Sequence, residues 1–443
     1  MAEAPTTRMA GEGEAAAAVP ETNAEVVIVG GGIAGFATAL ALRRTGVASR
    51  GRVVVLERHA ELRATGAAIT IFPNGWFALR ALGVAHKLTS RYHSYETSKV
   101  TNLETGAMQV FRFAGNKDRK NTGQEVGLTP VDRKALLEAL AEELPPGTIR
   151  FSSKLVSIDT KAEAGDTSET VVLRLNDGTV IRAKVVIGCD GVHSVVARWL
   201  GMSEPVCSGR SAVRGLSVYP GGHGMQRGLQ QFLSEGLRAG MVPVSDTDIY
   251  WFFFSNTVPT EKEAVGDPTK TLWEVTDNLG KHMPAKYLEV VGHSDLGNLS
   301  WAPLLYRSPW AILAGRAARG AVTVAGDAFH PMTPELGQGG CSALEDAVVL
   351  ARALSRASTP AEGVAAYVAE RRFRAAWLVA GAYLTGWVQQ GGTNTGTMCR
   401  HVVKLFRDRV FYRHVLPRLV DTMWYNCGDL MTAPCEEGKD HHE

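Results

Sequence analysis

The stretch VVIVGGGIAGFATALALRR, residues 26–44, decides the fold of this chain. A β-rich run leads into a glycine turn, and a helical pattern follows. In the order Gly30-x-Gly32-x-x-Gly35, the first glycine allows a tight turn and the second lets a pyrophosphate approach the backbone, while the third lets helix and strand pack closely. A second buried-type strand at 53–57 completes the start of a βαβ unit with a parallel sheet. The pattern predicts a Rossmann-like dinucleotide-binding domain.

Glu57 stands at the end of that second strand, about 20 residues after Gly35, where a carboxylate suits hydrogen bonding to ribose hydroxyls. An ordinary solvated strand end is the alternative. A 2′-phosphate would meet this carboxylate, so the residue argues against NADP in this pocket. It does not separate FAD from NAD.

Two later segments favour FAD. In VVIGCDGVHS, residues 185–194, a strand ends in Asp190-Gly191 before a helix, although an ordinary loop with a helix cap has the same pattern. In GDAFHPMTPELGQGG, residues 326–340, a strand delivers Asp327 to the carboxyl edge of the sheet, where ligands bind. Residues 337–340 then open a helix, and its free N–H groups suit a negatively charged reduced flavin.

The predicted fold class is therefore α/β: a discontinuous, Rossmann-like FAD-binding domain with an inserted mixed β-sheet substrate domain and C-terminal helices. The boundaries expected from composition and pattern are a disordered tail at 1–24, the FAD-binding domain at 25–204 and 301–395 (which includes part of the substrate-side sheet), a substrate-covering β-rich region at 205–300, and a C-terminal helix and tail at 396–443.

Bulk properties exclude several classes of function. The chain has 443 residues, 45% hydrophobic and 21% charged, with a net charge of +2 and no basic block, so nucleic acid is not an expected partner. Its cysteines form no CxxC pair and no histidine cluster has zinc spacing, so no metal site is expected. The sequence shows no pattern of a signal peptide or a bilayer-spanning run, which favours the cytoplasm.

The three segments resemble the group A flavoprotein monooxygenases, the family of para-hydroxybenzoate hydroxylase, salicylate hydroxylase and zeaxanthin epoxidase. The similarity runs from about residue 24 to about residue 383, and GDAFHPMTPELGQGGCSALEDAVVLA is its most specific part. The chain looks most like the plant monooxygenases related to salicylate hydroxylase. No transit peptide and no extra C-terminal domain of the kind expected of an epoxidase is recognised in it, so the resemblance does not favour carotenoid epoxidation.

The resemblance implies roles for individual residues. The ADP half of FAD would lie against the glycine turn and Glu57, with Arg58 beside it, and the Asp-Gly pair would meet both FAD and reduced nicotinamide. The cofactor-binding residues so implied are Gly30, Gly32, Gly35, Glu57, Arg58, Arg133, Asp190, Gly191 and Asp327, and the neighbours of the flavin ring are Pro331, Gly337, Gly339 and Gly340. Three positions depart from the family pattern: Cys189 and Phe329 stand where alanine is common, and Glu335 where asparagine is common.

The chemistry implied by the resemblance is monooxygenation. NADH or NADPH would reduce FAD, and dioxygen would then form a flavin hydroperoxide that hydroxylates or epoxidises a small aromatic or electron-rich substrate. Two alternatives stay open at this point: another FAD-dependent oxidoreductase, such as a reductase or oxidase, and a flavin-binding regulatory protein without turnover.

The sequence indicates less about which residues bind the substrate. Arg214 and Tyr219, in SAVRGLSVYP, are candidates to meet a carboxylate or phenol, although a structural role for Arg214 is equally consistent. The aromatic run at 251–254 suits a flat pocket, but strand alternation would place only half of it on one face. The catalytic residues stay unassigned.

The stretch 401–424 has an apolar side and several basic residues. A helix docked on the body with a solvated basic face is the preferred interpretation, and a helix lying on a membrane surface is the alternative. The docked helix requires Val402, Leu405, Phe406 and Leu416 to face the body. Pro417 is expected to kink it.

Overall fold

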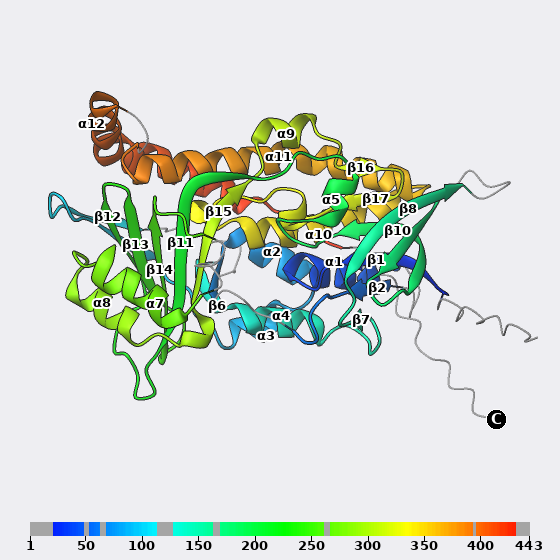
Figure 1. Cartoon of the computed structure of the whole chain (residues 1–443), viewed down its shortest axis with the longest axis horizontal. Coiled ribbons are helices and arrows are strands. Elements are labelled where there is room, and N and C mark those ends of the chain that lie inside the picture. The colour runs from blue at the N-terminus through cyan, green and yellow to red at the C-terminus, as the bar shows by residue number, and fades with distance from the viewer. Residues whose placement is uncertain are drawn as a thin grey trace, which may run out of the picture.

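The computed structural model describes residues 21–47, 53–62, 68–112, 127–162, 169–260, 266–392 and 396–430. A central sheet runs in the order β16-β17-β10-β1-β2-β7, with β9 and β8 attached beside β10 (Figure 1). β1, β2, β7, β10 and β17 are parallel to their neighbours along this path, and β16 is antiparallel to β17. The strands are β1 (Glu21–Val29), β2 (Val53–Leu56), β7 (Ile149–Arg150), β8 (Leu155–Ala162), β9 (Glu169–Leu175), β10 (Val180–Gly188), β16 (Ala318–Arg319) and β17 (Val322–Val324).

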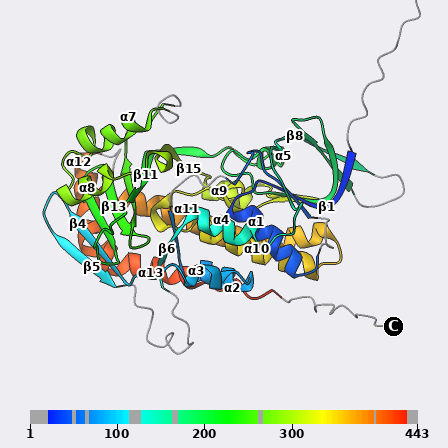
Figure 2. The same ribbon diagram turned by 90° about the horizontal axis from the view of Figure 1, so that it is seen from below.

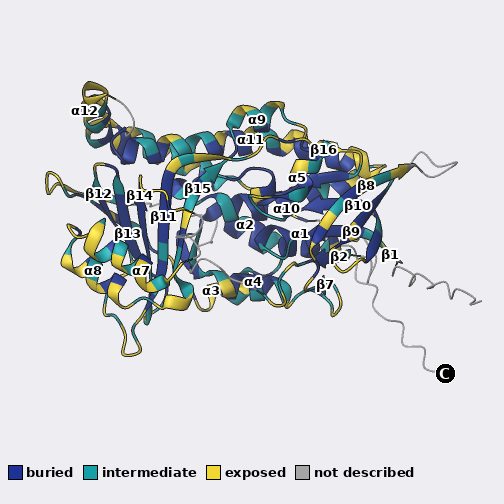
Figure 3. Ribbon diagram, viewed as in Figure 1, coloured by how far each residue is buried: buried dark blue, intermediate teal, exposed yellow. Residues whose placement is uncertain are grey.

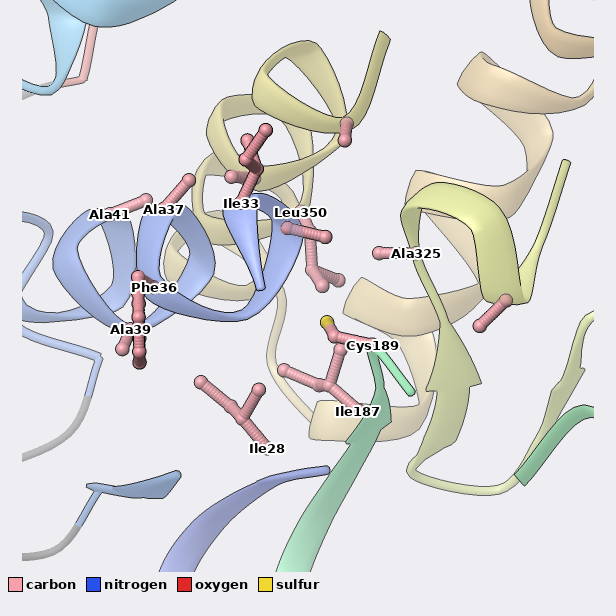
Figure 4. Packing of buried hydrophobic residues seen from close by; sticks show 14 of the residues in the cluster. Ile28, Ile33, Phe36, Ala37, Ala39, Ala41, Ile187, Cys189, Ala325 and Leu350 are labelled. Atoms are coloured by element: carbon pink, nitrogen blue, oxygen red, sulfur yellow. The ribbon is translucent and has the colours of Figure 1, made fainter. Parts of the chain in front are cut away.

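Two helices pack closely on each other above this sheet. The first, α1 (Ile33–Arg44), is buried along nearly its whole length, and α10 (Gly339–Arg356) lies against it. Figure 4 shows Ile28 of β1 and Ile187 of β10 beneath Ile33 and Phe36 of α1, with Leu350 of α10 alongside. Small and β-branched side chains let the layers approach, which fixes the glycine turn between β1 and α1.

A second sheet, ordered β15-β11-β14-β13-β12-β4-β5, forms the other end of the molecule (Figure 2). Helices α7 (Pro268–Trp273) and α8 (Ala285–Gly292) cover one of its faces. Its strands are β4 (Thr97–Asn102), β5 (Met108–Arg112), β11 (Val206–Val218), β12 (Leu229–Ser234), β13 (Leu237–Pro243), β14 (Asp248–Ser255) and β15 (Ser300–Tyr306). The sheet therefore combines strands from the inserted region with two that precede it in sequence.

The remaining elements connect and cover these sheets. β3 (Ala68–Ile71) and β6 (Thr129–Asp132) form an antiparallel pair. The helices are α2 (Pro73–Ala81), α3 (Ala85–Thr89), α4 (Arg133–Ala141), α5 (Val195–Trp199), α9 (Pro309–Ala314), the long α11 (Pro360–Gln389), α12 (Thr397–Phe406), the π-helix η6 (Arg407–Val415) and α13 (Leu416–Asp421). None of the helices in the described parts of the chain combines the length and the apolar character needed to cross a membrane.

The predicted fold class is confirmed, and one predicted boundary is wrong. The expected tail at 1–24 extends too far, because β1 already begins at Glu21 and residues 21–24 pair with residues 180–183 of β10. Backbone pairing with β10 overrides the polar composition of this segment. Residues 1–20 and 431–443, the rest of the two predicted tails, lie outside the described residues.

The C-terminal segment is a helix, but its predicted orientation is wrong in part. Val402, Leu405 and Phe406, expected to face the body, are all exposed, and Leu416 is half-buried. The docked face consists instead of Val403, Arg407, Phe411 and Tyr412. Pro417 lies in the first turn of α13, directly after the π-helix, so the helical segment is irregular where proline was expected to disturb it.

Candidate active site

The glycine turn after β1 is fixed by its own backbone packing. Gly30 adopts a φ of 107°, and a Cβ there would stand 2.3 Å from the carbonyl oxygen of Cys189. A Cβ on Gly35 would stand 1.9 Å from the carbonyl oxygen of Gly30. Neither position accepts a side chain: Gly30 brings the first and second predicted segments into direct contact, and Gly35 packs the start of α1 against the turn.

Gly32, unlike Gly30 and Gly35, is not packed against other atoms of the chain. A Cβ there would meet no atom within 4 Å, so nothing in the chain requires a glycine. Gly32 is also the N-cap of α1, which has no side-chain cap and no acidic residue in its first turn. The first N–H groups of this helix therefore stay available for a ligand, and a pyrophosphate suits both this positive helix end and the open space beside Gly32.

Glu57 closes the same loop. Its Oε2 accepts a hydrogen bond from the Gly31 N–H at 2.8 Å, and its Oε1 accepts one from the His59 N–H at 2.8 Å. A carboxylate has about four acceptor sites, so Glu57 can still accept hydrogen bonds from ribose hydroxyls. Arg58 is exposed beside it.

Asp190 has a structural role that the sequence raised as an alternative. Its carboxylate accepts hydrogen bonds from the Ser194 hydroxyl at 2.5 Å and the Val195 N–H at 2.7 Å, which secures the start of α5. Burial raises the pKa of Asp190, and the Ser194 hydrogen bond opposes this shift. Gly191 has a φ of 81° and open space where a Cβ would lie. Ser194 is the N-cap of α5, and its hydroxyl accepts a hydrogen bond from the Ala197 N–H, so the helix cap raised from the sequence as an alternative is present.

Asp327 and Arg133 lie close enough for their charges to interact. Asp327 is exposed within a turn whose flanking residues are buried, so its carboxylate faces open space at the carboxyl end of β17. Arg133 opens α4, and its buried Nε has no hydrogen-bond partner among the described residues. Burial lowers the pKa of Arg133, and the charge of Asp327 opposes that shift. An orphaned buried donor beside an open carboxylate is what a polar ligand between them would satisfy.

The turn before α10 combines ligand-facing and packing glycines. A Cβ on Gly339 would stand 3.7 Å from Oδ1 of Asp327, so this glycine borders the open carboxylate. The start of α10 has no side-chain cap. Gly337 has a φ of 64°, whereas a Cβ on Gly340 would stand 2.1 Å from Ile69. A side chain at Gly340 would therefore have to displace the terminal methyl of Ile69. Pro331, the remaining predicted neighbour of the ring, is buried.

The three departures from the family pattern are accommodated inside the protein. Phe329 is completely buried against Tyr367, away from the open space at Asp327. The Cys189 side chain is likewise part of the core in Figure 4. Glu335 is buried in an ion pair with Arg210 of β11, a partner that the sequence did not reveal. This pair ties the turn before α10 to the second sheet.

A buried ionic network lies beneath the turn, and sequence reasoning missed it. Arg371 of α11 donates to Glu345 Oε2 at 2.5 Å and to Asp346 Oδ1 at 2.7 Å, and all three side chains are fully buried. Asp346 Oδ2 also lies 2.6 Å from His330 Nε2 and accepts the Gly326 N–H at 2.8 Å. The adjacent acids in the otherwise apolar run ALEDAVVLA were the available signal, since buried carboxylates need partners.

Asp346 makes the stability of the fold sensitive to acid. Burial alone would raise its pKa, but the charges of His330 and Arg371 outweigh burial and lower the pKa from 3.8 to about 2. Because the folded pKa is depressed, this stabilisation is complete above about pH 4 and is lost as the pH falls towards about 2. We expect Asp346→Asn to flatten the decline of the thermal midpoint in this window. Asp159→Asn, at an exposed site, should keep the wild-type slope, and equal slopes in all three proteins would contradict the assignment.

The two predicted substrate residues lie on opposite faces of the second sheet. Val213, the strand neighbour directly before Arg214, packs in the core under α8. Tyr219 lies on that same face, with its ring stacked on His293 at a centroid distance of 4.4 Å. Arg214 alternates to the other face, where its charge acts on Arg133. The structure therefore brings Arg214, but not Tyr219, to the flavin side.

Tyr250 of β14 and Arg238 of β13 lie on the same face of the second sheet as Arg214. Burial raises the pKa of Tyr250, and the charges of Arg214, Arg238 and Arg133 oppose the shift. Arg238 is buried, donates to Gln231 Oε1 at 2.8 Å and lies over the rings of Phe252 and Phe254 at 5.3 and 5.4 Å. Its Nη1 has no hydrogen-bond partner among the described residues.

A separate groove lies away from these residues. It has a volume of about 810 Å³ between β5 and the C-terminal helices, where Phe111, Tyr412 and Trp424 contribute to its walls. None of the predicted flavin-binding residues lines it. The fit to FAD therefore rests on the open space at Gly32, the uncapped starts of α1 and α10, and the interacting charges of Arg133 and Asp327.

Comparisons with known proteins identify the family of this chain. The FAD binding domain family matches residues 23–382. Monooxygenase 2 of Arabidopsis thaliana is 36% identical over 429 residues, covering 93% of this chain and 99% of that protein. Aurachin C monooxygenase/isomerase of Stigmatella aurantiaca is 30% identical, covering 84% and 91%.

The solved structures show the same fold. Klebsiella pneumoniae HpxO complexed with FAD and uric acid aligns with a TM-score of 0.74 at 23% identity, covering 91% of this chain and 96% of that one. The similar proteins named here are monooxygenases or FAD complexes, which decides against the reductase, oxidase and non-catalytic alternatives. The chain belongs to the FAD binding domain family and is an FAD-dependent monooxygenase.

Proposed function

We propose that this monooxygenase hydroxylates a small aromatic substrate carrying an anionic or hydrogen-bond-accepting group, with NADH or NADPH as electron donor. The observation that carries the proposal is the row formed by Arg133, Arg214, Tyr250 and Arg238, which leads from the flavin side along one face of the second sheet. The uric acid complex of HpxO supports a small-molecule substrate on this fold.

FAD, when bound, would provide the redox chemistry: it would take electrons from reduced nicotinamide and support transfer of one oxygen atom from dioxygen to the substrate. The chain holds it through the turn at Gly32, the carboxylates of Glu57 and Asp327, and the guanidinium of Arg133. Asp190-Gly191 stays a proposed contact for FAD and reduced nicotinamide. The protein's contribution is to bind, orient and exclude water, and we assign no general base. The cytoplasmic location stays a prediction.

The substrate would lie against Tyr250 and the ring of Phe252, with its polar group towards Arg238. A buried guanidinium without a partner on one nitrogen is costly, and a carboxylate or enolate oxygen would satisfy it. The neighbouring aromatic rings provide flat apolar surface for the rest of a small ring system. Epoxidation of a large apolar substrate fits this charged row less well.

The experiment that tests the function is a coupled assay on the purified yellow protein. A panel of aromatic acids, phenols and neutral analogues would be mixed with NADH or NADPH under ¹⁸O₂, with hydrogen peroxide measured in parallel. We expect nicotinamide oxidation to rise with one or more aromatic acids and the product to carry one ¹⁸O atom. If every compound only raised peroxide, the proposed hydroxylation would be wrong.

Arg238→Gln should weaken binding of the anionic substrate. Losing a charge-assisted hydrogen bond in a buried site costs about 1.5–3 kcal/mol, roughly a 10- to 150-fold rise in KM. Arg227→Gln, which removes an exposed arginine from the same region, is the matched control and should change KM little. FAD content and circular dichroism would verify folding. An unchanged KM in a folded Arg238→Gln protein would remove Arg238 from the substrate site.

A further inference from the structure

The outer side of the C-terminal helices carries a continuous apolar stripe. Met398, Val402, Leu405 and Phe406 follow the spacing i, i+4, i+7, i+8, which places them on one face of α12, and Val410 follows one turn later; all five are exposed. We call these five residues the C-terminal stripe. Figures 1 and 3 show α12 at one end of the molecule, with much of its surface exposed.

The opposite face of the same helix explains why the stripe points outward. Val403 and Arg407 are buried against the body, and Arg407 donates to the Gln389 carbonyl at 3.2 Å. Arg400 and Lys404, on the same side, form ion pairs with Glu235 at 2.6 and 2.7 Å. The body thus holds the helix by one face only, and the stripe has no role in docking.

The charges around the stripe are mainly basic. Between residues 396 and 424 the sequence has six Lys or Arg and two Asp, both counted over that same range. Arg409, Arg413 and Arg418 are exposed and form no ion pair with any residue that the structure describes. Apolar residues bordered by exposed cations complement a surface that is itself anionic and apolar beneath.

A second copy of the chain fits this surface poorly. In a twofold contact the same patch faces itself, so the exposed arginines of one copy would oppose those of the other. Like charges brought together at an interface are unfavourable. The observations therefore favour lipid over self-association.

We infer that the C-terminal stripe and its flanking arginines bind an anionic lipid surface, with α12 and the π-helix lying in the plane of the headgroups. Met398, Val402 and Phe406 enter the acyl boundary, and Arg409 and Arg413 contact lipid phosphates and carboxylates. The inference does not depend on the substrate proposed above, because no residue of the flavin or substrate side belongs to the stripe.

Flotation of the FAD-loaded full chain with vesicles tests this. The vesicles would be phosphatidylcholine alone or phosphatidylcholine with 30% phosphatidylserine, at low and at high salt. We expect binding to the anionic vesicles at low salt only. Each of Arg409→Gln and Arg413→Gln should weaken binding about fivefold, the typical contribution of one basic residue near such a surface.

Val402→Glu and Val156→Glu form a matched pair, since the two valines are 59% and 58% exposed. Val156 lies on β8, at the opposite end of the molecule from α12 (Figure 1). Val402→Glu should abolish flotation and Val156→Glu should retain it, with FAD content unchanged in both. Three outcomes would overturn the inference: no flotation of the wild type, equal behaviour of the two variants, or a wild-type dimer that Val402→Glu dissociates without any vesicle binding.

Discussion

Gly35→Ala is expected to destabilise the whole FAD-binding domain, whereas Gly32→Ala is expected to fold normally and bind FAD weakly. A Cβ on Gly35 would stand 1.9 Å from a backbone oxygen, so helix and strand must separate, at a cost of about 3 kcal/mol, the upper part of the range for overpacking. A Cβ on Gly32 meets nothing in the chain and enters only the space assigned to the pyrophosphate. We expect its FAD dissociation constant to rise at least about tenfold, or ~1.4 kcal/mol.

Two measurements separate the effects. Thermal unfolding of the FAD-free proteins should place Gly32→Ala with the wild type and Gly35→Ala well below it, and flavin fluorescence titration should then give the affinity of each folded protein. Unchanged FAD affinity in Gly32→Ala would show that the pyrophosphate does not approach this glycine.

Arg371→Met is expected to be the most destabilising change in the core outside the glycine turn. It leaves Asp346 buried with only His330 as a side-chain partner, and removing one member of a buried ion pair costs about 3–5 kcal/mol. Since Asp346 also holds the Gly326 N–H, the turn bearing Asp327 should loosen and FAD should dissociate more readily. Denaturant unfolding and FAD retention on gel filtration would measure both consequences.

Lys286→Met serves as the comparison, because Lys286 and Glu289 form an exposed pair of the kind that contributes less than about 1 kcal/mol. Arg371→Lys keeps the charge but loses the fork that reaches both acids, so its stability should be intermediate. If Arg371→Met were as stable as Lys286→Met, the network would have no structural importance.

The sequence was most informative where function depends on backbone geometry. The spacing of Gly30, Gly32 and Gly35 predicts the tight turn between the first strand and its helix. The position of Asp327 directly after a strand predicts that it lies at the carboxyl edge of the sheet. Because both signals are local in sequence, they can be recognised without knowledge of the partners that the fold supplies.

The rest depends on contacts between distant segments. Glu335 pairs with Arg210 and Asp346 with Arg371, and nothing in either local pattern indicates its partner. Arg238 and Tyr250 lie in strands whose alternation is readable, but the face turned to the flavin depends on how the second sheet docks. Likewise, the amphipathic pattern at 401–424 predicts a helix but not which side the body covers, so the apolar side was wrongly assigned to the docked face.

The pairing of β4 with β12 has a consequence for the synthesis of this protein. β4 emerges from the ribosome long before its parallel neighbour β12, and β10 must likewise wait for β17 at residues 322–324. Neither sheet can be completed until about seven tenths of the chain has been translated, so a growing chain holds unpaired strand edges for many seconds. Nascent chains truncated before β17 should therefore be held by chaperones or degraded, and stable half-length products are not expected.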